Sequence, residues 1–140
     1  MLDLFSRRVV GWATSDRLKR DLAVEALRRA LVARTPGPGL VHHSDRGSQY
    51  CAVDYQALLR KCGILISMSG RGNGHDNAMV ETFFKTIKSE LIWPVAWQTR
   101  AQARNAVPRY IDGFYTPLRR HSSRGFQSPI AFERKAREVS

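Results

Sequence analysis

The sequence predicts an α/β domain in which short strands alternate with helices. With 140 residues, 43% of them hydrophobic, the chain is long enough to bury one core without metals or disulfides. Between residues 40 and 68, a β-prone run, a segment with helical spacing of apolar residues and a second β-prone run follow closely. Strand, helix and strand in short succession are typical of a βαβ unit, so we expect a parallel pair of strands.

The first part of the chain predicts a hairpin followed by one helix. The apolar runs Met1–Phe5 and Val9–Ala13 flank Ser-Arg-Arg, a pattern that indicates two short paired strands. Asp16 or Asp21 is expected to cap the helix. The proline and glycine residues of Thr35–Gly39 end it. Its apolar residues recur at helical spacing and are Ala23, Ala26, Leu27, Ala30 and Leu31.

The strand, helix and strand of the predicted βαβ unit are Leu40–His43, Ala52–Cys62 and Ile64–Met68. The helix is expected to end at Gly63, whose freedom to adopt positive φ suits a C-cap. The glycines in Ser69–His75 alternate with other residues and match no phosphate-binding fingerprint. We expect this stretch to be a mobile loop.

The second half of the chain predicts helices. A long helix covers residues 76–93, and Pro94 stops it. Another begins near Thr99 and runs towards the Asp-Gly-Phe-Tyr stretch, with Pro108 as a kink or break. For the last helix, the Ser-Pro pair at positions 128 and 129 supplies the cap and the first-turn proline.

The chain carries 23 Lys and Arg residues against 12 Asp and Glu residues, a formal net charge of +11. Nine basic and three acidic residues fall within residues 100–140, so the excess is concentrated towards the C-terminal end. Such a surface favours a polyanionic partner, of which nucleic acid is the commonest. A basic surface that only confers solubility stays an alternative.

Composition also excludes several classes of protein. No apolar run is long enough to span a bilayer, and no charged segment followed by a long apolar stretch marks an export signal. Cys51 and Cys62 do not combine with the histidines in a usual zinc-binding pattern, so we expect both to be reduced thiols. These features predict a soluble cytoplasmic protein with no membrane contact and no small-molecule substrate.

Two carboxylates are distinguished by their positions. On the helix over residues 76–93, one stripe of apolar side chains forms the core face: Val80, Phe83, Phe84, Ile87 and Leu91. Asn77, Glu81 and Lys88 form a second stripe beside it, because steps of four and seven residues nearly complete whole turns. Taken alone, a helical Glu is usually a solvated surface residue. Asp45, however, follows the first strand of the βαβ unit, and ligands of open α/β folds lie beyond the carboxyl ends of strands. The two carboxylates could converge there.

Three stretches in order resemble a known family: HSDRGSQY from His43, SMSGRGNGHDNAMVETFFKTIKSE from Ser67, and RRHSS followed by SPIAFE towards the end. They are similar to the catalytic core of DDE-type insertion-sequence transposases, relatives of retroviral integrases with a ribonuclease H-like fold. The resemblance covers nearly the whole chain and implies a mixed sheet flanked by helices that lacks the first strand. It also implies a partial integrase catalytic core over residues 1–115 and a basic C-terminal tail over residues 116–140.

By this resemblance Asp45 is the second catalytic aspartate and Glu81 the catalytic glutamate, with 35 residues between them. Both are implied as ligands of Mg²⁺ or Mn²⁺. Lys88, two turns after Glu81, is implied to hold the DNA end. For Arg46 and Gln49 an anchoring role in the turn stays open, as does a solvated charge run for residues 119–121. The further residues expected to contact DNA are Asn77, Arg46, Gln49, Lys85, Arg119, Arg120 and His121.

The family's first catalytic aspartate lies on a strand upstream of this sequence. Asp3 does not replace it, because Asp3 belongs to a segment that follows that strand in the family. Transposases of this kind cut a phosphodiester bond with water and then join the freed 3′-hydroxyl to a target strand, normally with two metal ions and three carboxylates. With two carboxylates, we expect weak binding of one ion and a truncated copy with weak or no activity.

The implied partners are DNA, as transposon ends and target, and further copies of the chain. Loss of the first strand would leave unpaired backbone near residues 1–5, so we expect a homo-oligomer that associates through that edge. A catalytically dead DNA-binding module that competes or assembles with full-length transposase is an alternative. An RNA-binding protein is another, although no motif of stacking aromatic residues supports it.

Overall fold

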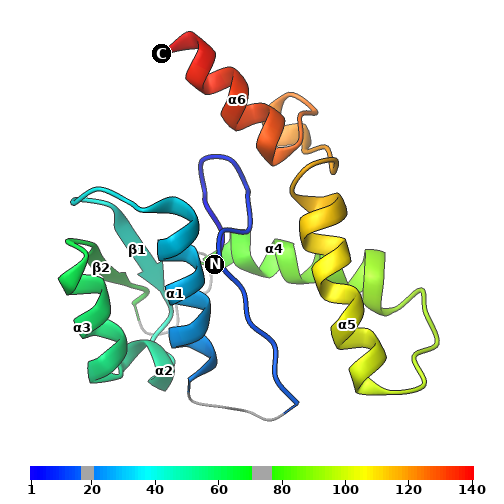
Figure 1. Cartoon of the computed structure of the whole chain (residues 1–140), viewed down its shortest axis with the longest axis horizontal. Helices are drawn as coiled ribbons and strands as arrows, with labels where there is room; N and C mark the ends of the chain where they lie inside the picture. Colours follow the sequence, from blue (N-terminus) through cyan, green and yellow to red (C-terminus); the bar gives the residue numbers. More distant parts are fainter. Residues whose placement is uncertain (17–20, 71–76) are drawn as a thin grey trace. The chain divides into compact units, whose positions relative to one another are not determined.

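The computed structural model describes residues 1–16, 21–70 and 77–140, and it shows helices together with a small parallel sheet (Figure 1). The chain divides into two compact units. The first unit contains Met1 and residues 11–82, and the second contains residues 2–10 and 83–140. Among the described residues, no helix combines the length and the apolar character needed to cross a bilayer.

The first unit is built around the predicted βαβ arrangement. Its strands β1 (Val41–Ser44) and β2 (Leu65–Met68) run parallel, with Val41 opposite Leu65 and Ser44 opposite Met68. Its helices are α1 (Leu22–Arg34), α2 (Ser48–Cys51) and α3 (Val53–Lys61). The predicted parallel pair is therefore confirmed, with each strand starting one residue later than expected.

The core of the first unit joins both long helices to the sheet. Leu27 of α1, Tyr55 and Leu59 of α3, and Ile64 before β2 form one buried cluster. Each fully buried side chain of this size contributes about 1.5–3 kcal/mol relative to an exposed position. The Tyr55 hydroxyl lies 2.9 Å from Nε2 of His42 on β1, so the polar end of this buried ring has a partner. Burial lowers the pKa of His42, so its imidazole is neutral at neutral pH.

Two residues with positive φ end the helices of this unit. Gly63 follows α3 with φ +70°, which confirms the predicted glycine stop. A side chain at Gly63 would also crowd Pro38, because an added Cβ would lie 3.0 Å from the Cβ of that proline. Thr35 ends α1 with φ +43°, at the start of the proline and glycine segment expected to stop the helix.

The second unit is helical apart from its N-terminal segment. Its elements in order are α4 (Ala78–Ile87), whose first turn belongs to the first unit, π-helix η2 (Lys88–Ile92), α5 (Arg100–Tyr110), π-helix η3 (Ile111–Tyr115), 3₁₀-helix η4 (Ser122–Arg124) and α6 (Pro129–Val139). Side chains cap two of these helices, one of them through the predicted cap residue Ser128. The Thr99 hydroxyl accepts from the Gln102 N–H, and the Ser128 hydroxyl accepts from the Ala131 N–H.

The N-terminal segment of the second unit is held by residues from the C-terminal end. The guanidinium of Arg124 donates to the carbonyl oxygens of Phe5 at 2.6 Å and Leu4 at 2.8 Å. The same guanidinium lies over the ring of Phe132 of α6, and the Phe5 and Phe132 ring centroids are 5.1 Å apart. The segment over residues 2–10 and the C-terminal helix therefore belong to one packed unit.

Several predicted elements need correction. The expected hairpin is reduced to a single antiparallel bridge between Leu2 and Val9, and Arg7 in the turn between them has φ +66°. The helix over residues 76–93 is confirmed from Ala78, but its last part is a π-helix. Pro108 does not break α5, which continues through it to Tyr110. Residues 71–76, which include most of the predicted mobile loop, lie outside the described residues.

Gly11 provides a direct test of packing in the first unit. It is buried, and a Cβ added there would meet the carbonyl oxygen of Ala26 and lie 2.7 Å from the Cβ of Ala30. Because α1 is the obstacle, we expect Gly11→Ala to lower the free energy of unfolding by about 1–3 kcal/mol in urea denaturation. Gly37→Ala is the matched control, since an added Cβ there meets nothing within 4 Å. Equal stabilities of the two variants would contradict this packing.

Candidate functional site

The carboxyl ends of β1 and β2 are tied together by side chains. His43 of β1 bridges two serines, with Nδ1 2.9 Å from the Ser67 hydroxyl and Nε2 3.0 Å from the Ser69 hydroxyl. The backbone continues the ladder one step further, because the Ser69 N–H donates to the Ser44 carbonyl at 2.9 Å. With both ring nitrogens engaged, His43 serves to hold this edge of the sheet. Asp45 is the first residue to leave it.

Asp45 occupies a tight turn between β1 and α2. Its Oδ1 accepts a hydrogen bond of 2.7 Å from the Gly47 N–H, which orients the carboxylate, and the side chain is exposed to solvent. A Cβ added at Gly47 would lie 2.9 Å from Asp45 Oδ1 and 2.8 Å from Gln49 Oε1, so a larger residue there would displace the ends of these two side chains. The sequence Asp-Arg-Gly thus presents an acidic group with a fixed orientation at the strand end.

Arg46 and Gln49 lie in the same turn. The Nε of Arg46 donates to the Ser69 carbonyl at 2.9 Å, so this arginine links the turn to the residue after β2. Gln49 is half-buried in α2, with its amide next to Gly47. Of the two roles left open for this pair, these contacts favour anchoring of the turn.

Glu81 lies in the first turn of α4 and is exposed. Asn77, immediately before α4, is partly buried. The first unit contains Asp45, Asn77 and Glu81 together. Within the described ranges, no group of three or more His, Cys, Asp or Glu side chains is placed so that it could hold a metal ion. Asp45 and Glu81, the two candidate metal ligands named from the sequence, are both exposed.

The two lysines of this helical segment belong to the second unit. Lys85 is in the last turn of α4, and Lys88 is the first residue of the π-helix η2. The α-helical spacing that was counted from Glu81 therefore ends at Ile87, immediately before Lys88. Both lysine side chains are exposed. Both ammonium groups are therefore open to solvent and to an anionic partner.

Arg119 has a structural partner that the sequence did not indicate. Its Nε donates to both carboxylate oxygens of Glu90, at 2.9 and 2.8 Å, and its guanidinium lies over the Tyr115 ring. The Tyr110 hydroxyl donates to the same carboxylate at 3.2 Å. One acidic group of η2 therefore connects α5 with the segment after η3. An arginine bound in this way is less available for a phosphate than a free one.

His121 and Arg120 differ in their exposure. The imidazole of His121 is partly buried against Tyr115, with ring centroids 5.2 Å apart. Burial, followed by the nearby guanidinium groups of Arg119, Arg7 and Arg124, lowers the pKa of His121. Its ring is therefore neutral at neutral pH and brings no positive charge to a phosphate. Arg120 is exposed, so its guanidinium can reach a phosphate.

The residues missed by sequence reasoning are Glu90, Tyr110 and Tyr115. Tyr110 and Tyr115 are five residues apart, a spacing that an α-helix would place on different faces. The π-helix η3 changes this, since its hydrogen bonds join residues five apart, as from the Thr116 N–H to the Ile111 carbonyl. The two tyrosine rings then lie 6.1 Å apart. The five-residue spacing of Tyr110 and Tyr115 was the signal available in the sequence.

Comparison with known families agrees with this architecture. A family model described as "Integrase core domain" matches residues 1–74, and a second one of the same description matches residues 62–129. The chain belongs to the integrase core domain family. The resemblance inferred from the sequence motifs is confirmed, and so is the α/β class of an integrase core.

Curated relatives of this integrase core domain protein include transposases. It is 43% identical over 133 residues to the transposase for insertion sequence element IS904 of Lactococcus lactis subsp. lactis (strain IL1403), which covers 95% of this chain and 53% of that protein. It is also 43% identical over 135 residues to transposase InsF for insertion sequence IS3A of Escherichia coli (strain K12), covering 96% and 47%. The insertion element IS600 uncharacterized 31 kDa protein of Shigella sonnei is 40% identical over 138 residues, covering 99% and 51%. The chain therefore spans about half the length of the curated relatives it matches.

The structural role of Arg119 can be separated from the charge of the segment around it. We expect Arg119→Ala to lower the free energy of unfolding by about 1 kcal/mol, because it leaves the Glu90 carboxylate without its main partner in a partly exposed site. Arg120→Ala removes the same charge from an exposed side chain, so its effect should stay within about 0.5 kcal/mol. Chemical denaturation measures both. Identical effects would contradict the role assigned to the Glu90 pair.

Proposed function

We propose that this integrase core domain protein acts in DNA transposition, as a catalytic core for cleavage and transfer of phosphodiester bonds. The observation that carries the proposal is the position of Asp45, an exposed and oriented carboxylate at the end of a parallel strand in a chain of this family. Glu81, exposed on the first turn of α4 in the same unit, is proposed as the second carboxylate. Transposases among the relatives support the reaction class.

The other residues named from the sequence have proposed tasks as well. Arg46 holds the turn that carries Asp45, through its bond to the Ser69 carbonyl. Asn77, one turn before Glu81, is proposed to orient that carboxylate or a group of the DNA. Lys85 and Lys88, both exposed, are proposed to bind phosphates of the DNA end. Gln49 and Arg120 are the remaining proposed contacts to DNA. Arg120 is the exposed cation among residues 119–121.

The donor chemistry of the candidate site fits a hard divalent cation. Asp45 and Glu81 offer exposed carboxylate oxygens, and Mg²⁺ usually takes one or two protein carboxylates with water and phosphate as its other ligands. We propose that these two residues hold Mg²⁺ or Mn²⁺. Such an ion supplies charge stabilisation at phosphoryl oxygens and activation of an attacking oxygen. With two carboxylates rather than three, binding by the isolated chain is expected to be weak.

A DNA-binding module without cleavage activity is the second candidate function. It is favoured by the exposed cations of the chain, among them Lys85, Lys88 and Arg120, which can bind phosphates without a metal ion. Such a chain would bind duplex DNA in a salt-dependent way through its basic side chains. It could then compete or assemble with a longer transposase.

One experiment addresses both candidates. Mg²⁺ and Mn²⁺ are titrated into the labelled protein, with NMR of the backbone amides as the readout of binding and nicking of supercoiled plasmid as the readout of cleavage. We expect weak, saturable shifts at Asp45 and Glu81, with loss of the shifts in Asp45→Asn and Glu81→Gln. Asp54→Asn is the matched control, since Asp54 is an exposed acid on α3 outside the candidate site.

The outcomes are distinct. Metal-dependent nicking that Asp45→Asn and Glu81→Gln abolish would support the catalytic core. Salt-sensitive duplex binding with no nicking would support the DNA-binding module. Unchanged amides at both carboxylates would refute the metal site, and absence of duplex binding at low salt would refute both candidates.

We also propose that the chain associates with a second copy through its small sheet. The two described strands pair only with each other, so each has an edge without a strand partner in the described part of the chain. Val41 and Leu65, which face each other across the pair, are each 57% exposed. Exposed apolar side chains beside open strand edges favour pairing with another chain.

Sedimentation velocity tests this association. We expect a concentration-dependent dimer that Val41→Lys weakens, because a charge on a strand edge disfavours pairing. Val53→Lys is the control, since Val53 is 83% exposed on α3 and outside the sheet. A single monomeric species at all concentrations would contradict the proposal.

A further inference from the structure

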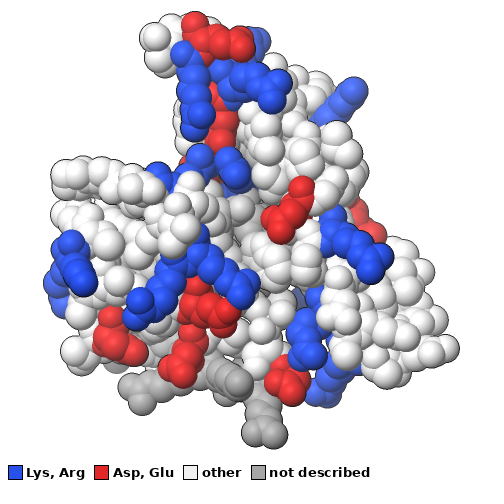
Figure 2. All heavy atoms as spheres, viewed as in Figure 1, with Lys and Arg blue, Asp and Glu red and all other residues white. Residues whose placement is uncertain are grey.

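The last helix of the second unit borders a pocket that none of the predicted site residues line. In Figure 2, basic and acidic side chains lie next to each other along the part of the molecule that α6 forms in Figure 1. The pocket has a volume of about 380 Å³. Its lining residues are Arg8, Ile130, Glu133, Arg134, Arg137 and Glu138. Three arginines are thus among the residues that line one open pocket, whose volume is large enough for a phosphate with its sugar.

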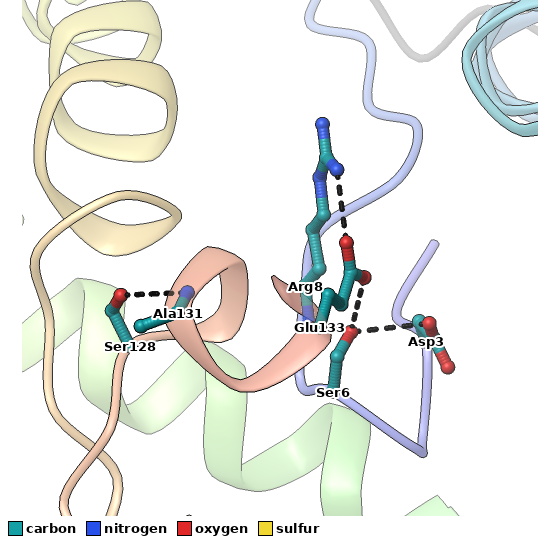
Figure 3. A network of polar contacts seen from close by, with 6 residues as sticks. All are labelled: Asp3, Ser6, Arg8, Ser128, Ala131 and Glu133. Atoms are coloured by element: carbon teal, nitrogen blue, oxygen red, sulfur yellow. Dashed lines mark hydrogen bonds and ion pairs between the residues drawn. The ribbon is translucent and has the colours of Figure 1, made fainter. Parts of the chain in front are cut away.

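Arg8 is held in place by a network of hydrogen bonds that includes the buried side chain of Ser6 (Figure 3). Ser6 is fully buried, and its hydroxyl lies 2.7 Å from Glu133 Oε1 and 3.1 Å from Asp3 Oδ2. The other oxygen of Glu133 accepts from Arg8 Nη1 at 3.2 Å. Figure 3 shows the Glu133 carboxylate between the Ser6 hydroxyl and the Arg8 guanidinium. The negative charge of Glu133, whose side chain is 11% exposed, is therefore matched by Arg8.

Arg134 and Arg137 supply the positive charge that this pair does not neutralise. Both are exposed, and they lie three residues apart on α6, on the face that also carries Ile130. Side chains at this spacing are neighbours on a helix, with Cβ atoms about 5–6 Å apart. Two arginines one turn apart can therefore reach successive phosphates of one strand. Arginine suits this task, because its planar guanidinium binds phosphate oxygens in a bidentate way.

Glu138 is the acidic residue that opposes anion binding here. It lies near the C-terminal end of α6 and is exposed. With Arg8 and Glu133 paired, the pocket retains two arginines against this one carboxylate. The excess is positive, and removal of the Glu138 charge would increase it.

We propose that the pocket of α6 is a subsite for the phosphate backbone of duplex DNA, in which Arg134 and Arg137 each contact a phosphate and Arg8, paired with Glu133, completes the lining. The inference rests on the proposed action on DNA and adds a contact surface away from the carboxylates. Its contacts are sequence-independent, since phosphates are the same in every sequence.

The salt dependence of duplex binding tests this subsite. Each phosphate contact contributes about 0.9 to the slope of log K against log salt concentration, so Arg134→Ala with Arg137→Ala should reduce the slope by about 1.8. Lys135→Ala is the matched control, because Lys135 is an exposed cation on the same helix but outside the pocket lining. We expect it to leave the slope nearly unchanged. Glu138→Gln should raise the affinity.

Two further measurements make the result unambiguous. The charge-preserving pair Arg134→Lys with Arg137→Lys should keep the slope and lose affinity, and circular dichroism should show unchanged helix content in all variants. If the wild-type chain binds duplex DNA but the double alanine variant behaves like Lys135→Ala, the subsite is refuted and the proposed function stands. If the wild-type chain has no affinity for duplex DNA, both are refuted. Equal or stronger binding to single-stranded RNA would assign the pocket to another nucleic acid and overturn the inference.

Discussion

The parallel pairing of β1 with β2 is the constraint on which the candidate site depends. Because Ser44 pairs with Met68, the next residue of each chain segment leaves the sheet at the same edge. The bridge from His43 to Ser67 and Ser69, and the bond from Arg46 to the Ser69 carbonyl, then hold that edge closed. A one-residue slip of register would turn every strand side chain to the opposite face. The orientation of Asp45 is thus a consequence of strand register rather than of the local turn alone.

The second unit depends in the same way on shared carboxylates. Glu90 accepts from Arg119 and Tyr110, which links the two π-helical regions, and Glu133 accepts from Ser6 and Arg8, which links the chain's first residues to α6. A basic chain needs such acceptors, because partly buried guanidinium groups such as those of Arg8 and Arg119 are costly to leave without partners. The scarce acidic residues of this unit therefore organise its structure, and few remain to oppose an anionic partner.

Local patterns explain which elements were predictable. The apolar spacing of α1, the caps Thr99 and Ser128 and the glycine after α3 depend on short-range interactions, and all are present. The roles of Asp45 and Glu81 came from motif resemblance, since a helical glutamate alone carries no such signal. The pairing of Arg119 with Glu90 joins residues far apart in sequence, so no local pattern could indicate it. The π-helices and the continuation of α5 through Pro108 are likewise set by tertiary packing, which overrides local propensity.

The arginines show why formal charge overstates the charge available to DNA. Arg8, Arg119 and Arg124 are bound to carboxylates or backbone carbonyls, so their guanidinium groups already have partners inside the protein. Counterion release depends on the cations that face phosphates rather than on the sum of all charges. A net charge of +11 therefore does not translate into eleven phosphate contacts. Under the proposed function, the exposed cations on α6, α4 and η2 and at position 120 are the ones expected to set the salt dependence of DNA binding. The internally bound guanidinium groups are expected to contribute to stability instead.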